Sequence, residues 1–179
     1  ADIREPHGNF PVGTKKIQVD SHDLSSLPFT DIVLLATPVG AREAYIHEFC
    51  KRDTLLFTEK PFAINTISHE SYLRLTPNIV CNYMRRYYSS IRQLQSLISS
   101  QIFGKLKQVI IVEGGIVGKT KKGKTHYQMN SQLSGGGILM ESGCHTLSQL
   151  TFLLSDYRFT LLSRDVQQQD YFDVDITAN

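Results

Sequence analysis

Uninterrupted apolar runs mark the first elements along the chain. The run "DIVLLATP" (31–38) is apolar without alternation, which is typical of a strand buried on both faces of a parallel sheet. Residues 40–53 then place apolar positions at helical spacing between charged ones. A second apolar run, "TLLFTEKP" (54–61), follows at once. Strand, helix and strand over this length predict a βαβ unit, whose crossover is right-handed in nearly all proteins.

The same alternation of helix and strand continues once more. Residues 65–75 have helical spacing, and Asn65 or Ser68 is available as the N-cap. The segment "NIVCNY" (78–83) is typical of a further strand. The first half of the chain is therefore predicted to be an α/β unit around a parallel sheet.

The second half of the chain mixes helices with extended segments. An amphipathic helix is predicted over 89–104, with Gly104 as its C-cap. Segments 105–117, 158–166 and 171–176 are predicted to be extended, and the last of them alternates strictly between apolar and polar residues. Such alternation indicates an antiparallel sheet with one covered face. We therefore expect an α+β layer with an open, mainly antiparallel sheet.

Composition narrows the class of protein. Of the 179 residues, 41% are apolar and 20% are charged, which is ordinary globular composition. The net charge of +2 is too small to indicate a nucleic-acid partner. No apolar run approaches the roughly 18 residues that cross a bilayer. We expect a soluble, cytoplasmic protein without a nucleic-acid or membrane partner.

The three cysteines carry no sign of a cross-link or a metal. Cys50, Cys81 and Cys144 are widely scattered and have no Cys-x-x-Cys spacing. Cys144 precedes His145, but adjacent helix positions point apart, so these two do not form a nucleophile–base pair. We expect reduced, mostly buried thiols and no metal site.

Both strands of the βαβ unit end in polar residues followed by proline. The first ends in Thr37-Pro38 and the second in Glu59-Lys60-Pro61. In an open parallel sheet, ligands bind in the crevice beyond the carboxyl ends of the strands, so both ends would face one crevice. The alternative is that the prolines only end the strands and the charges are solvated.

A carboxylate and an imidazole lie four residues apart in "SGGGILMESGCHTLSQL" (134–150). Glu141 and His145 would share one face of a helix, as an acid/base unit or as an ordinary surface pair. The three glycines at 135–137 permit close backbone approach by another surface, which favours the acid/base unit. As metal ligands the pair supplies two groups where zinc needs at least three.

Basic residues elsewhere offer weaker candidates for anion binding. The loop "GKTKKGK" (118–124) is compatible with phosphate binding, although lysine with glycine is typical of a solvated loop. Arg85 or Arg86 in "MRRYY" (84–88) is placed to clamp an anion or to form a surface ion pair.

Four motifs occur in one order along residues 31 to 155: "DIVLLATP", "FTEKP", "YMRRY" and "SGGGILMESGCHTLSQL". This ordered set resembles the glucose-fructose oxidoreductase and inositol dehydrogenase family of NAD(P)-dependent sugar and polyol dehydrogenases. The resemblance implies an incomplete Rossmann domain over residues 1–83. It also implies that residues 84–179 begin a substrate domain, whose open sheet serves homo-oligomer contacts.

The resemblance also implies roles for individual residues. Lys60 would lie between the nicotinamide and the substrate, and the helix after the glycines would supply Glu141 and His145 as the acid and the histidine. The residues expected to line the cofactor site are Asp2, Arg4, Thr37, Pro38, Glu59, Lys60 and Arg86.

Two features depart from the family pattern. The acid is usually aspartate, and Glu141 is one methylene longer. The Gly-rich turn that seats the pyrophosphate does not occur, and "ADIRE" (1–5) resembles the segment that follows it. In that frame Asp2 would bond the adenosine ribose and favour NAD, while Arg4 leaves NADP open. We expect about 30 further residues before Ala1, as a βαβ start requires.

The leading functional hypothesis is hydride transfer between NAD or NADP and a secondary alcohol of a sugar, sugar derivative or cyclitol. His145 would act as general base, Glu141 would favour the imidazolium, and Lys60 would stabilise charge on the reacting oxygen. The alternative is a non-catalytic relative that acts as a binding or interaction module. A third hypothesis is metal-dependent hydrolysis through Glu141 and His145.

Overall fold

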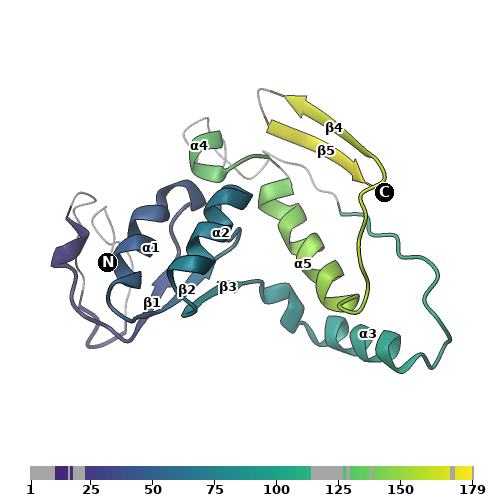
Figure 1. Ribbon diagram of the computed structural model, residues 1–179, viewed down its shortest axis with the longest axis horizontal. Coiled ribbons are helices and arrows are strands. Elements are labelled where there is room, and N and C mark those ends of the chain that lie inside the picture. Colours follow the sequence, from purple (N-terminus) through teal and green to yellow (C-terminus); the bar gives the residue numbers. More distant parts are fainter. Residues whose placement is uncertain are drawn as a thin grey trace.

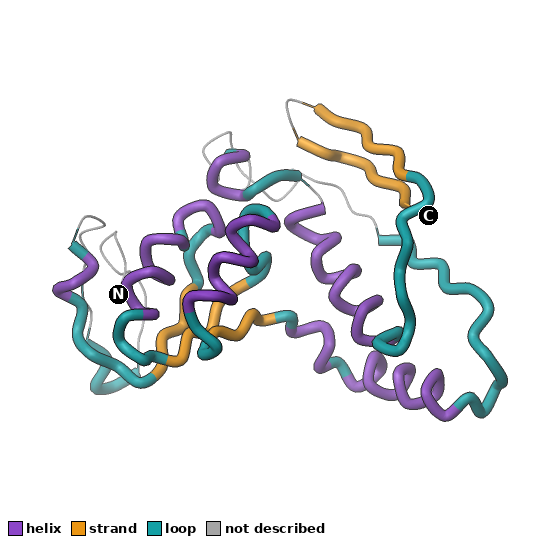
Figure 2. The backbone as a smooth tube through the Cα atoms, viewed as in Figure 1, coloured by secondary structure: helices purple, strands orange, loops and turns teal. Residues whose placement is uncertain are grey.

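The computed structural model describes most of the chain (Figures 1 and 2). The described residues are 11–15, 17, 23–113, 127, 130–137, 139–169 and 172–178. Three predicted features lie outside them: Asp2, Arg4 and the basic loop 118–124.

A parallel sheet of three strands forms the first half. Its strands are β1 (Ile32–Leu35), β2 (Leu55–Glu59) and β3 (Ile79–Asn82), in the order β1-β2-β3. Helix α1 (Glu43–Cys50) connects the first pair and α2 (Thr66–Leu75) the second. The predicted βαβ unit, extended by a third strand, is confirmed, and so is the partial Rossmann-type fold class.

One face of this sheet carries the core. Helices α1 and α2 pack against each other on the same side of the sheet (Figure 1). Ile46 of α1 and Leu56 of β2 are fully buried beneath them. Asn65 caps α2 as predicted, because its side chain accepts a hydrogen bond from the Ser68 N–H at 2.8 Å. The remaining buried residues of this core are Leu24, Leu27, Leu35, Phe49, Phe62, Ala63, Tyr72 and Ile79.

The opposite face of the sheet is open among the described residues. Ile32 and Leu34 of β1 are 62% and 66% exposed, and Leu55 and Val80 on the neighbouring strands are exposed too. The prediction that the first apolar run is buried on both faces is therefore wrong for this chain. An apolar run fits a strand with two covered faces, but it does not itself supply the second layer.

A helical layer follows β3. A short 3-10 helix (Met84–Tyr87) leads into α3 (Ser89–Ser100), which packs against α5 (Cys144–Leu153). The predicted cap of α3 is wrong: the helix ends at Ser100 and its C-cap is Gln101, which has a φ of 52°. Gly104, with a φ of 84°, shapes the next turn instead.

The remaining elements come from the second half of the chain. The pattern predicts an extended segment over 105–117, but residues 105–113 run as irregular chain without a strand (Figure 2), and residues 114–117 lie outside the described residues. A short helix, α4 (Ser131–Ser134), and a turn of π-helix (Leu139–Gly143) precede α5. Strands β4 (Arg164–Gln169) and β5 (Phe172–Ala178) pair antiparallel, so the predicted antiparallel pairing is confirmed for this hairpin.

Candidate active site

The carboxyl ends of the three parallel strands gather the predicted polar residues at one edge. Thr37 and Pro38 follow β1, Glu59 ends β2 with Lys60 directly after it, and Asn82 ends β3. In the sheet register Glu59 lies opposite Asn82. The Asn82 side-chain amide donates to Oε1 of Glu59 at 2.8 Å, which fixes this carboxylate across the two strands.

Lys60 reaches from this edge to the second half of the chain. Its Nζ donates to the main-chain oxygen of Glu141 at 2.7 Å and lies 3.4 Å from Oε1 of the same residue. The Lys60 side chain is only 18% exposed. Two of the three predicted catalytic residues, 81 positions apart in sequence, are therefore in direct contact.

The glycine run explains how the chain approaches so closely. Gly135 has a φ of 78°, and a Cβ at this position would lie 3.0 Å from Cγ1 of Ile64, just beyond β2. A Cβ at Gly40 would lie 1.9 Å from the main-chain oxygen of Gln132 in α4. Glycine is therefore required at both positions where the two halves of the chain approach each other. The sequence indicated Gly135 but not Gly40.

Glu141 lies inside the turn of π-helix rather than in regular α-helix. Such turns are rare and occur frequently at functional sites. The helix becomes regular at Cys144, so His145 stands in the first turn of α5. The simple picture of an i, i+4 pair on one α-helix is therefore replaced by a pair that spans the junction of two helix types.

His145 is buried at this junction. The residue is 7% exposed, and its Nδ1 has no hydrogen-bond partner among the described residues. Burial lowers the pKa of His145, and the positive charges of Lys60 and Arg85 lower it further. The carboxylates of Glu113 and Glu59 act in the opposite direction but do not restore the ordinary pKa. The imidazole is therefore neutral at neutral pH, as a general base must be.

Glu113 and Arg85 form a charged cluster beside His145 that the sequence did not reveal. Nη1 of Arg85 donates to Oε1 of Glu113 at 2.8 Å, and the Thr146 hydroxyl donates to the other carboxylate oxygen. Burial alone would raise the pKa of Glu113, but these hydrogen bonds outweigh it and lower the pKa. The sequence offered Arg85 as an anion clamp or a surface ion-pair partner, but nothing in it indicated that Glu113 is the partner.

Arg86, a predicted cofactor contact, is engaged with α5. Its Nε donates to the Ser148 hydroxyl at 2.6 Å, and its Nη2 donates to the Thr151 hydroxyl at 3.2 Å. These bonds dock the 3-10 helix after β3 onto the helix that carries His145. They favour a structural role, and the cofactor role of Arg86 stays a prediction.

Arg42, which no motif in the sequence indicated, is buried at the carboxyl edge. Only 1% of it is exposed, and its guanidinium donates to the main-chain oxygens of Thr37, Glu59 and Pro61 at 2.8, 2.5 and 2.5 Å. Burial lowers the pKa of Arg42 from its ordinary value. These contacts tie together the loops that follow β1 and β2.

Two further groups near the edge are unreactive. Burial raises the pKa of the Cys144 thiol to about 11 and that of the Tyr83 hydroxyl to about 12. The thiol of Cys144 is therefore protonated at neutral pH, in line with the expectation that it is not a nucleophile.

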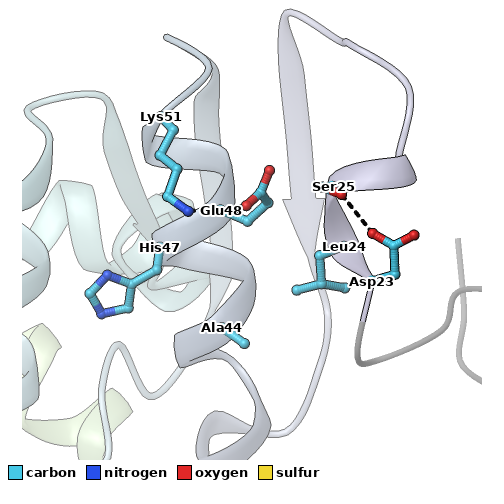
Figure 3. Close-up of a pocket in the computed structure, with 7 residues that line it drawn as sticks. All are labelled: Asp23, Leu24, Ser25, Ala44, His47, Glu48 and Lys51. Carbon is cyan, nitrogen blue, oxygen red and sulfur yellow. Dashed lines mark hydrogen bonds and ion pairs between the residues drawn. The ribbon is translucent and has the colours of Figure 1, made fainter.

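A shallow cavity of about 270 Å³ lies away from this edge (Figure 3). It is formed by His47, Glu48 and Lys51 on α1, together with the 3-10 helix at Leu24–Ser26. Helix α1 starts after the carboxyl end of β1 and runs back along the sheet, so its last residues lie toward the amino ends of the strands. The cavity is therefore separate from Lys60 and His145.

The described ranges contain no helix long and apolar enough to cross a membrane. Within the same ranges, no three His, Cys, Asp or Glu side chains are grouped as a metal site requires.

Comparison with known proteins bears on the fold. No family model matches the sequence, and no curated protein matches it significantly. Solved structures do match. An NAD-binding protein from Listeria innocua is 19% identical with a TM-score of 0.64, over 85% of this chain and 44% of that one.

Two other matching structures have named activities. Myo-inositol dehydrogenase from Lactobacillus casei, in complex with NAD(H) and myo-inositol, is 20% identical with a TM-score of 0.58, over 84% of this chain and 42% of that one. Aldose-aldose oxidoreductase from Caulobacter crescentus, complexed with glycerol, is 16% identical with a TM-score of 0.62, over 78% and 41%. The chain shares their fold. It spans less than half of their length, and the identities are too low to carry more than the fold.

Proposed function

We propose that the protein is a nicotinamide-dependent oxidoreductase that acts on a secondary alcohol of a sugar, sugar derivative or cyclitol. The observation that carries this proposal is the contact between Lys60 and Glu141 beside the buried His145. A cation, a carboxylate and a neutral imidazole from separate elements meet at the carboxyl edge of a parallel sheet, where open α/β folds bind ligands. The solved structures that share this fold include oxidoreductases of polyols and aldoses.

The residues at this edge fit the nicotinamide end of such a cofactor. Oγ1 of Thr37 and Nδ1 of His145 are both buried, and neither has a hydrogen-bond partner within the described part of the chain. Buried polar atoms are normally satisfied, so two such atoms at one edge favour a further bound group. Thr37 and Pro38 would hold this end, with Glu59 nearby. The assignment of Asp2 and Arg4 to the adenosine end, and with it the choice of NAD or NADP, stays a prediction.

Proton transfer is the task that His145 is suited to perform. Its lowered pKa keeps an imidazole nitrogen available to accept the substrate hydroxyl proton as the alcohol is oxidised. When bound, the nicotinamide accepts or returns the hydride. In the reverse direction the same nitrogen gives the proton back to the reduced oxygen.

Lys60 would stabilise the negative charge that develops on the reacting oxygen. Its ammonium is held by the main-chain oxygen of Glu141, so its direction is fixed before a substrate arrives. The Glu141 carboxylate, 3.4 Å away, compensates this positive charge. We propose that Glu141 acts first through Lys60, and that Glu113 is a second carboxylate beside His145 that favours the imidazolium.

Binding and turnover of the full-length native protein test the proposal. Quenching and energy transfer of NADH and NADPH fluorescence should show saturable binding, and a panel of cyclitols and aldoses should show nicotinamide reduction at 340 nm. The Lys60→Ala variant should bind the cofactor but turn over far more slowly. Absence of binding by either cofactor would reject the proposal and select the non-catalytic binding module.

Metal-dependent hydrolysis needs a separate assay, which follows product release without added nicotinamide. Activity that survives exhaustive chelation removes that hypothesis. Activity that requires an added divalent cation and no nicotinamide would instead establish it.

A further inference from the structure

A buried arginine begins α1 at a position where local preference would place a different residue. Arg42 is the N-cap residue of α1, and its side chain makes no capping hydrogen bond there. Helix N-caps favour Ser, Thr, Asp or Asn, and a cation near a helix N-terminus opposes the helix dipole. A residue that breaks a local rule usually serves a tertiary or functional purpose.

The contacts of Arg42 indicate that purpose. Nη1 binds the main-chain oxygens of Glu59 and Pro61, which are the residues on either side of Lys60. Nη2 binds the main-chain oxygen of Thr37, beyond the end of β1. The guanidinium therefore holds the backbone of Lys60 from both sides and fixes it to the neighbouring strand end.

Charge makes these contacts unusually directional. Within the described ranges Arg42 has no carboxylate within ion-pair distance, so its buried positive charge is stabilised by main-chain carbonyl dipoles and, from further away, by the Glu59 carboxylate. Hydrogen bonds with an ionised donor are roughly twice as strong as neutral ones, and the planar guanidinium sets their directions. A lysine in its place keeps the charge but loses the planar fork.

We propose that Arg42 is a positioning residue that sets the place and direction of the Lys60 ammonium. The proposal rests on the proposed function for its effect on turnover. A second consequence is independent of the proposed function. If the Glu59–Pro61 segment loosens, the Lys60 amine becomes more exposed, whatever the protein catalyses.

The chain offers a matched control at the other end of α1. Arg52 also donates to three main-chain oxygens, those of Leu24, Ser25 and Leu27, at 3.0, 3.1 and 2.7 Å. It lies away from Lys60 and holds the 3-10 helix at Leu24–Ser26. Replacing Arg52 therefore disturbs a similar set of carbonyl contacts without touching the candidate site.

The experiment compares Arg42→Gln and Arg42→Lys with Arg52→Gln in the full-length protein. An amine-selective acetylating reagent is applied under native conditions, and mass spectrometry gives the labelling rate of Lys60 relative to that of the exposed Lys51. Circular dichroism establishes that each variant is folded. Where turnover is measurable, kcat and KM are determined separately.

The expected result is a severalfold rise in the relative labelling of Lys60 in Arg42→Gln, a smaller rise in Arg42→Lys and none in Arg52→Gln. The kcat of Arg42→Gln should fall about a hundredfold, since displacements of about 1 Å have effects of this size, while KM changes little. Arg42→Lys should recover part of this loss.

Two results would overturn the proposal. One is a folded Arg42→Gln with unchanged Lys60 labelling, or the same change in Arg52→Gln. The other is failure of both Arg42 variants to fold while Arg52→Gln folds, because Arg42 would then serve the fold as a whole. If the wild type neither binds nicotinamide nor turns over, the proposed function fails, and the labelling result still decides the role of Arg42.

Discussion

The two edges of the parallel sheet each hold an arginine against main-chain oxygens, but the charge of the arginine is stabilised differently at each edge. At the amino edge Arg52 has an ion pair with Glu48 at 2.7 Å, and its guanidinium also lies 5.2 Å from the ring centre of Phe49. At the carboxyl edge Arg42 has main-chain oxygens only. At the carboxyl edge two of the other cations are paired, Lys60 with Glu141 and Arg85 with Glu113. Negative charge that develops on a reacting oxygen would therefore meet the fixed Lys60 ammonium rather than a net positive field.

The largest difference between the edges should appear in turnover. Lys60→Ala removes the ammonium that Glu141 holds in place, so we expect kcat to fall about a thousandfold, as for loss of one oxyanion donor. The control is Lys51→Ala at the amino edge, whose exposed side chain contacts Glu48. Stopped-flow or steady-state rates of nicotinamide reduction measure both. Equal rates for the two variants would remove the functional distinction between the edges.

Stability should also distinguish the two arginines. Replacing Arg42 by Met removes the charged donor from four main-chain oxygens, those of Thr37, Glu59, Pro61 and Phe62, and we expect the free energy of unfolding to fall by about 3 kcal/mol. Arg52→Met should cost about 1–2 kcal/mol, because water can reach the carbonyls at this more exposed edge. Urea unfolding at fixed pH measures both values. A larger loss for Arg52 would reverse the comparison.

Acid should weaken the carboxyl edge through His145. The unfolded chain takes up this proton near pH 6.5, but the folded protein takes it up only at lower pH, because burial lowers the pKa of His145. The contribution of His145 to stability is therefore complete above pH 6.5 and is lost as the pH falls through the folded-state pKa. Urea midpoints between pH 7 and about pH 5 should fall more for the wild type than for His145→Gln.

The control for this titration is His47→Gln, at an exposed histidine of α1. It gives the effect on stability of replacing an imidazole that lies outside the candidate site. An identical slope in His145→Gln and the wild type would mean that this imidazole does not titrate between the two states.

The smallest effect is expected for the acid that departs from the family pattern. Glu141→Asp keeps the main-chain oxygen that holds Lys60 and shortens the side chain of a partly exposed ion pair. Such pairs contribute at most about 1 kcal/mol, so kcat should change less than about fivefold. Glu48→Asp, which alters the ion pair at the amino edge, should leave kcat unchanged. A hundredfold loss for Glu141→Asp would show that the carboxylate itself takes part in proton transfer.

The sequence predicted the parts of this molecule that depend on side-chain pattern. The apolar runs located β1 and β2, and the polar residues after them located Thr37 and Lys60. Arg42 gave no signal, because its partners are main-chain oxygens and these are the same for every residue. The cluster of Arg85 and Glu113 was missed because its partners are far apart in sequence, and no spacing rule joins them.

The sequence did not predict two details of the helices correctly. The pattern assigned the C-cap of α3 to Gly104, yet the C-cap lies three residues earlier at Gln101, in a left-handed conformation. The turn of π-helix before α5 was also invisible, because its sequence is equally compatible with α-helix. The predicted domain boundary at residue 83 and the homo-oligomer contact stay predictions.

The turn of π-helix sets the direction in which His145 points from the helix axis, and so its position relative to Lys60. Each residue of an α-helix advances the chain by about 100°. Deleting one residue between Leu139 and Gly143 would let regular α-helix continue into α5, at the cost of rotating His145 against the Glu141 oxygen that binds Lys60. Chain length in this segment is therefore under tighter constraint than its residue types, and a single-residue deletion should be harder to tolerate than most substitutions.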